Sequence, residues 1–199
     1  MNLPNKLTVL RVILIPFFML FILLPDFVGE EHRLWCDIVA AAVFGIASYT
    51  DYLDGHIARK EGIVTDFGKF MDPIADKLMV FGAFLCFMVS SAYSIYRYIF
   101  AIVVFIVLLR EFAVTSIRLV AQSSGGKVIA ADKLGKMKTV MQICFILFAL
   151  LEKHIFFFCE PLAKYMPITC VLCIVMLVLT VISGINYLRN NKEFLDPTK

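Results

Sequence analysis

Four aspartates stand where two long apolar segments approach each other along the chain. Asp51 and Asp54 are three residues apart, and Asp72 and Asp76 are four apart, so each pair shares one face of a helix. A charge inside a membrane span costs about 2.5–3.5 kcal/mol on insertion scales, so four carboxylates need compensating positive charge. Carboxylate oxygens are the ligands that Mg²⁺ and Mn²⁺ prefer, whereas zinc prefers histidine and cysteine. The pattern therefore predicts two bound divalent cations, an arrangement that suits a phosphoryl displacement.

Small and cationic residues follow the first pair of aspartates. Gly55 and Ala58 remove side-chain bulk on the face that carries the carboxylates, so a nucleotide or diphosphate would lie close to the backbone there. Arg59 is suited to pairing with phosphate oxygens. Asp66 stands near these residues, and it either caps the following helix or contacts the nucleotide. The stretch predicts a membrane enzyme with a carboxylate-bound metal site.

The composition of the whole chain is that of an integral membrane protein. Hydrophobic residues make up 61% of its 199 residues, against roughly 45–50% in soluble domains, and the mean hydropathy is +0.87. The length suits a single domain over residues 1–199, with about six spans of roughly 20 residues each. The net charge of +3 is too small to indicate a nucleic-acid partner. The six cysteines lie mostly in apolar runs, and we expect them to be buried free thiols.

The fold expected from hydropathy is all-α, with six transmembrane helices and an N-terminal amphipathic segment along the membrane interface. That segment begins at Asn2 and includes Arg11, and the first span is expected to be retained rather than cleaved as a signal peptide. The predicted spans cover residues 7–24, 34–59, 68–90, 96–120, 132–151 and 168–188. The aspartate pairs end the second span and begin the third, so all four carboxylates are expected at one side of the membrane.

The positive residues favour one orientation of these spans. One side collects most of the cations, namely Lys6, Arg11, Arg59, Lys60, Lys69, Lys127, Lys133, Lys136, Lys138, Arg189, Lys192 and Lys199. The other side has Arg33, Arg97, Lys153 and Lys164. Because cationic loops face the cytoplasm, we expect both termini and the aspartates at the cytoplasmic side of the cell membrane.

The spacing of the aspartate stretch resembles the signature of the CDP-alcohol phosphatidyltransferase family. The matching positions are Asp51-x2-Asp54-Gly55-x2-Ala58-Arg59-x8-Gly68-x3-Asp72-x3-Asp76. The resemblance implies a six-helix membrane core, a homodimer, and displacement of CMP from a CDP-linked lipid by an alcohol hydroxyl. It also implies that the four aspartates bind two divalent cations and that Asp76 is the base that takes the hydroxyl proton. By the same resemblance, the CDP pocket would be lined by Gly55, Ala58, Arg59 and Gly68.

Three further stretches resemble the phosphatidylglycerophosphate synthase branch of that family, whose substrates are CDP-diacylglycerol and glycerol 3-phosphate. They are Asn5-x-Leu7-Thr8-x2-Arg11, the pair Arg110-Glu111 with Arg118, and Gly135-Lys136-x-Lys138-Thr139. An acceptor with its own phosphate dianion needs cations that the metals do not supply. The residues suited to binding it are Arg110, Arg118 and Lys136, with Lys138, Thr139, Thr8 and Arg11 as weaker candidates.

Several alternatives stand beside these assignments. Inositol phosphate or phosphatidylglycerol would also need cations, so either is an alternative acceptor. Intramembrane aspartates also occur in cation transporters, although the glycine, alanine and arginine spacing favours the enzyme. Arg110 and Glu111 would alternatively form a structural ion pair. Because adjacent helical residues do not face each other, Glu111 is instead expected to contact another helix or to orient a neighbour. Arg118 and the lysines would alternatively be interfacial anchors, and His154 is expected to have no role.

Overall fold

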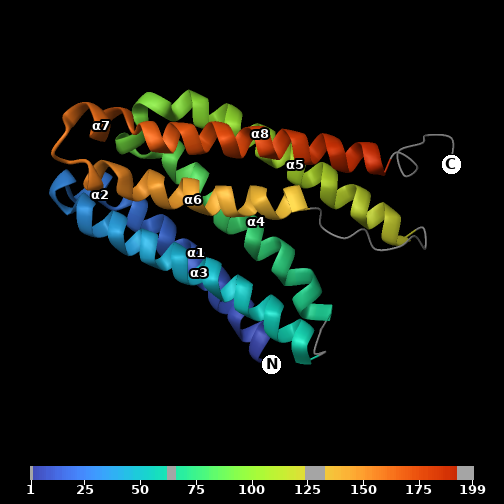
Figure 1. The fold of residues 1–199 in the computed structure, drawn as a ribbon. Coiled ribbons are helices and arrows are strands. Elements are labelled where there is room, and N and C mark those ends of the chain that lie inside the picture. Colours follow the sequence, from blue (N-terminus) through green and yellow to red (C-terminus); the bar gives the residue numbers. More distant parts are fainter. Residues whose placement is uncertain (1, 62–65, 124–132, 192–199) are drawn as a thin grey trace. The chain divides into compact units, whose positions relative to one another are not determined.

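The computed structural model describes residues 2–61, 66–123 and 133–191, and every regular element within them is helical. Figure 1 shows these elements in chain order. The α-helices are α1 (Leu3–Leu23), α2 (Pro25–Val28), α3 (Arg33–Glu61), α4 (Asp66–Val89), α5 (Arg97–Ser123), α6 (Lys133–Ile155), α7 (Glu160–Tyr165) and α8 (Pro167–Asn190). Two 3₁₀ helices, η1 (Glu30–His32) and η2 (Ser91–Tyr96), lie between them.

The long helices confirm a multi-pass, all-α membrane protein. The six longest, α1, α3, α4, α5, α6 and α8, correspond to the six predicted spans. Five stretches in the described residues are long and apolar enough to cross a membrane, so the count of six is approximate. The exception is α4, whose first half carries Asp72, Asp76 and Lys77. The expected amphipathic segment forms the first turns of α1, which runs from Leu3 without a break.

The chain divides into two compact units. Unit 1 comprises Met1–Phe100 and Ile146–Met166, and unit 2 comprises Ala101–Phe145 and Pro167–Lys199. The single domain over residues 1–199 stays a prediction.

Unit 1 is organised around α1, which packs against both α3 and α4 (Figure 1). Phe18 of α1 and Phe44 of α3 are fully buried, and their ring centres are 5.4 Å apart. Gly82 of α4 lies against Met19 of α1, where an added Cβ would come within 3.1 Å of the methionine sulfur. These contacts hold the later turns of α1 against the middle of α3 and the second half of α4.

A buried aspartate near the start of α3 holds a second part of unit 1 together. Asp37 is fully buried, and its Oδ2 lies 3.1 Å from Lys153 Nζ and 2.8 Å from His154 Nε2, both in the last turn of α6. The expectation that His154 has no role is therefore wrong. Tyr93 of η2 donates a hydrogen bond of 2.9 Å to the carbonyl of Ala149, also in α6.

Arg33, the first residue of α3, joins the neighbouring short helices to this end of unit 1. Its Nη2 lies 2.6 Å from Asp26 Oδ1 and donates to Ser91 Oγ at 3.1 Å. Its guanidinium also pairs with Glu30 of η1. The side chain is buried, so these contacts satisfy a cation that has little access to solvent.

Unit 2 contains most of α5, the first half of α6 and all of α8. Val114 and Ile117 of α5 are buried with Tyr187 of α8, and Leu188 packs against them. This apolar contact places one face of α5 beside the C-terminal half of α8.

Candidate active site

The acid cluster, which we define as Asp51, Asp54 and Asp72, forms where α3 and α4 meet α1 in unit 1. Arg11 of α1 lies between the two aspartates of α3, with Nη1 2.7 Å from Asp51 Oδ1 and Nη2 2.5 Å from Asp54 Oδ2. Thr8, one turn earlier, donates a 2.6 Å hydrogen bond to Asp72 Oδ1 of α4 and lies 3.5 Å from Asp54 Oδ2. The predicted convergence of the two helix ends is therefore confirmed for these three carboxylates.

The remaining residues of the aspartate stretch lie close to this cluster in the sequence. Asp76 is half-buried in α4, one turn beyond Asp72. Gly68 is buried and Gly55 is half-buried. The sequence places Ala58, Arg59 and Asp66 at or beside the CDP pocket. Their side chains lie outside the described part of the structure, although their backbones belong to α3 and α4.

A buried guanidinium lies within the acid cluster. Arg11 is fully buried, and it forms ion pairs with two of the three carboxylates, those of Asp51 and Asp54. Carboxylate oxygens from two helices are a donor set that fits Mg²⁺ or Mn²⁺. In the present arrangement, however, no three of the described His, Cys, Asp and Glu side chains are placed to hold one metal ion. The Arg11 guanidinium lies between Asp51 and Asp54 and forms an ion pair with each.

The cationic cluster, which we define as Arg110, Glu111, Lys138 and Ser183, joins three helices of unit 2. Arg110 of α5 donates from Nη1 to Glu111 Oε1 at 3.0 Å and from Nη2 to Ser183 Oγ of α8 at 2.8 Å. Lys138 of α6 donates to the same Glu111 oxygen. The prediction that Glu111 contacts another helix is confirmed by Lys138. The expectation that it would not face the adjacent Arg110 is wrong, because the two side chains also form an ion pair.

The other residues assigned to the acceptor are distributed around these two clusters. Within unit 2, Arg118 is half-buried, Lys136 is exposed, and Thr139 donates to the carbonyl of Gly135 in its own helix at 3.2 Å. Thr8 and Arg11 belong to unit 1, where both contact the acid cluster. The structure thus groups Arg110 with Lys138.

Sequence reasoning missed Ser183. It is one of several small residues in an apolar helix, and nothing in the spacing of α8 sets it apart. The only available signal was its position directly before Gly184, since two small residues in succession allow close approach of a neighbouring side chain.

Comparison with known proteins assigns this chain to a family and to close relatives within it. The sequence profile described as CDP-alcohol phosphatidyltransferase matches residues 1–186. The chain is 40% identical to the CDP-diacylglycerol–glycerol-3-phosphate 3-phosphatidyltransferase of Bacillus subtilis. The similarity covers 98% of this chain and 97% of that protein.

Two further relatives come from other bacterial groups. The chain is 35% identical to a probable phosphatidylglycerophosphate synthase of Mycobacterium tuberculosis, over 94% of this chain and 79% of the relative. It is also 35% identical to a CDP-diacylglycerol–glycerol-3-phosphate 3-phosphatidyltransferase of Yersinia enterocolitica, over 72% of this chain and 73% of that protein. With the acid cluster formed by the matching aspartates, these similarities lead to one conclusion: the chain belongs to the CDP-alcohol phosphatidyltransferase family.

Proposed function

We propose that this protein transfers the phosphatidyl group of CDP-diacylglycerol to glycerol 3-phosphate, forming phosphatidylglycerophosphate and releasing CMP. The observation that carries the proposal is the 40% identity to the Bacillus subtilis enzyme of that name over nearly the whole of both chains. The cationic cluster supports the same acceptor, because a phosphate dianion needs the charge-assisted hydrogen bonds that Arg110 and Lys138 offer.

The acid cluster would hold the reacting diphosphate through bound metal ions. Asp51, Asp54, Asp72 and Asp76 would bind two divalent cations, Mg²⁺ or Mn²⁺, which supply positive charge at the diphosphate when present. Arg11 would have to leave Asp51 and Asp54 for these carboxylates to act as ligands. The backbone at Gly55, Ala58 and Gly68, with Arg59 and Asp66 beside it, would accommodate the CDP moiety.

The chemical step then needs a base for the acceptor hydroxyl and side chains that bind the acceptor phosphate. Asp76 would take the proton of the glycerol 1-hydroxyl. The hydroxyl oxygen would form a bond to the phosphorus that carries the diacylglycerol, and the bond from that phosphorus to the oxygen of CMP would break. Arg110, Lys138, Arg118 and Lys136 would hold the phosphate of the acceptor, with Thr139, Thr8 and Arg11 as the weaker candidates. Asp76→Asn is expected to abolish turnover at every pH, and an active variant would overturn the assignment of the base.

A single assay tests the function. Purified protein in detergent is given CDP-diacylglycerol, and CMP release is measured with glycerol 3-phosphate, inositol phosphate, serine or phosphatidylglycerol as acceptor. We expect release only with glycerol 3-phosphate and only when Mg²⁺ or Mn²⁺ is present, with full loss after chelation by EDTA. Release with another acceptor would keep the chemistry but replace the substrate, and no release with any acceptor would refute the transferase.

The location and assembly are parts of the same proposal. The distribution of lysine and arginine supports a multi-pass protein of the bacterial cytoplasmic membrane, with both termini and the acid cluster on the cytoplasmic side. Cysteine labelling from each side of sealed vesicles tests this orientation. The expected homodimer is tested by crosslinking in native membranes.

A further inference from the structure

We propose that Ser183 and Gly184 of α8 are positioning residues for Arg110, and that they thereby set the affinity for the phosphate of the acceptor. The inference rests on the proposed function, in which Arg110 binds that phosphate. Neither residue belongs to the aspartate stretch or to the cationic motifs of the sequence. The contacts between α8 and α5 carry the argument.

Ser183 fixes one end of the Arg110 guanidinium. Its side chain is buried, and its Oγ accepts the hydrogen bond from Arg110 Nη2 at 2.8 Å. Glu111 holds the other end, since it accepts from Nη1 at 3.0 Å. A guanidinium is planar, so two contacts at opposite nitrogens determine the direction of the whole group. Each of these two nitrogens keeps a second N–H donor that an anion could accept from. Nε is buried, and it has no hydrogen-bond partner among the described residues.

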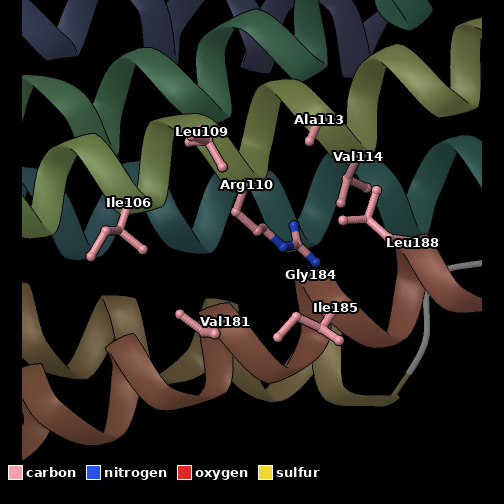
Figure 2. A pocket seen from close by; sticks show the side chains of 9 residues that line it. All are labelled: Ile106, Leu109, Arg110, Ala113, Val114, Val181, Gly184, Ile185 and Leu188. Atoms are coloured by element: carbon pink, nitrogen blue, oxygen red, sulfur yellow. The ribbon is translucent and has the colours of Figure 1, made fainter.

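Gly184 gives the stem of Arg110 its path past α8. A Cβ at Gly184 would lie 3.0 Å from Cγ of Arg110, closer than almost all real contacts, and 3.9 Å from its Cβ. Figure 2 shows the Arg110 side chain leaving α5 toward Gly184. Gly135 of α6 approaches the other end of the side chain more loosely, because a Cβ there would be 3.9 Å from both Arg110 Nη2 and Ser183 Oγ. Any side chain at Gly184 would therefore displace the stem.

Packing does not hold Arg110 in this path by itself. A cavity of about 130 Å³ borders its stem (Figure 2), with apolar walls that include Leu109, Val181 and Ile185. The stem has room to shift into this space, so the direction of the guanidinium depends on Ser183, Glu111 and the missing side chain at Gly184. The same space lets Gly184→Ala fold with a displaced guanidinium, which makes the substitution a test of positioning.

The experiment measures steady-state kinetics with both substrates varied. We expect Ser183→Ala and Gly184→Ala each to raise the KM for glycerol 3-phosphate about tenfold, as for the loss of a hydrogen bond to a charged group. The KM for CDP-diacylglycerol and kcat should stay within about twofold, and the melting temperature in detergent within about 3 °C. Ser183→Thr keeps the hydroxyl and should restore the KM for glycerol 3-phosphate. Gly45→Ala is the matched control, because an added Cβ at Gly45 in α3 meets nothing within 4 Å.

Arg110→Ala separates the inference from the proposed function. If it raises the KM for glycerol 3-phosphate while Ser183→Ala and Gly184→Ala do not, the positioning role is refuted and the function stands. If Arg110→Ala leaves that KM unchanged, both the acceptor role of Arg110 and the inference fail, while CMP release with glycerol 3-phosphate still tests the transferase. Equal changes in both KM values together with a large fall in melting temperature would show a merely structural role and also overturn the inference.

Discussion

Helix α3 carries a buried aspartate site near each of its ends, and the two sites differ in charge balance. Asp37, near the start, meets the ammonium of Lys153 and the ring of His154 through one carboxylate oxygen. Asp54 is 17 residues further on, or roughly 25 Å along the helix at about 1.5 Å per residue. It shares a single guanidinium, that of Arg11, with Asp51, and a threonine hydroxyl with Asp72.

From this difference we expect a structural role at the Asp37 site and ligand binding at the acid cluster. One buried acid with a cation and an imidazole is compensated within the protein, so it stabilises the contact between α3 and α6. Asp51, Asp54 and Asp72 are three neighbouring carboxylates, and like charges this close repel each other. Neighbouring like charges of this kind, one of them buried at Asp54, cluster at functional sites. We therefore expect substitutions at the Asp37 site to change stability and substitutions in the acid cluster to change catalysis.

The largest effect is expected at Asp54. Asp54→Asn should lower kcat by about 10³-fold, which corresponds to about 4 kcal/mol of transition-state stabilisation. The melting temperature of the metal-free protein should stay the same or rise, because the substitution removes one of three like charges. CMP release and thermal unfolding in detergent measure the two quantities. If Asp54→Asn retains a tenth of the activity, Asp54 is not part of the catalytic site.

The opposite result is expected at Asp37. Asp37→Ala leaves Lys153 buried without its carboxylate, and breaking such a pair costs about 3 kcal/mol or more. The melting temperature should fall by roughly 6–12 °C, while kcat of the folded enzyme should change less than about twofold. Glu31→Ala is the control, because this exposed acid of η1 pairs with an exposed histidine ring, that of His32. Loss of catalysis at unchanged stability would contradict the distinction between the two sites.

An intermediate effect is expected at Arg11, and it tests whether this guanidinium competes with a metal ion. If its guanidinium occupies the place of a metal ion, Arg11→Gln should tighten Mn²⁺ binding about tenfold, or about 1.4 kcal/mol. Free Mn²⁺ measured by electron paramagnetic resonance gives the dissociation constant without any turnover. Lys6→Gln removes the same charge from an exposed position of α1 and is the control. Unchanged or weaker binding in Arg11→Gln would show that Arg11 assists the metal rather than competing with it.

The smallest effect is expected at Ser91, which supports the compensated end of unit 1. Ser91 Oγ accepts a hydrogen bond of 3.1 Å from Arg33 and donates a hydrogen bond to Asp26 Oδ1. It is exposed, so Ser91→Ala should lower the free energy of unfolding by about 1 kcal/mol or less. Ser94→Ala, at another exposed position of η2, is the matched control. A loss of catalysis in Ser91→Ala would mean that this end of the unit has more than a structural function.

The sequence allowed prediction of those features that depend on local spacing and hydropathy. Apolar runs predicted the long helices, and the fixed spacing of Asp51, Asp54 and Asp72 predicted that their carboxylates meet. From the sequence, Arg11 and Thr8 are expected to bind the phosphate of the acceptor, whereas in the structure they contact the aspartates. The sequence does not distinguish the two, because a cation and a hydroxyl suit a phosphate as well as a carboxylate. The pairing of Asp37 with α6 and of Ser183 with Arg110 depends on how distant helices align along their lengths. No local pattern specifies that alignment.

The position of Arg11 in the first helix has a consequence for biogenesis. Its partner Asp54 is 43 residues later in the chain, so at about 5–20 residues per second it is synthesised roughly 2–9 s after Arg11. During that interval α1 would carry an uncompensated arginine, whose placement in the bilayer centre is unfavourable by about 2.5–3.5 kcal/mol. The beginning of α1 must therefore stay in reach of water or of the insertion machinery until α3 arrives, and the order of synthesis makes assembly of the acid cluster a late event.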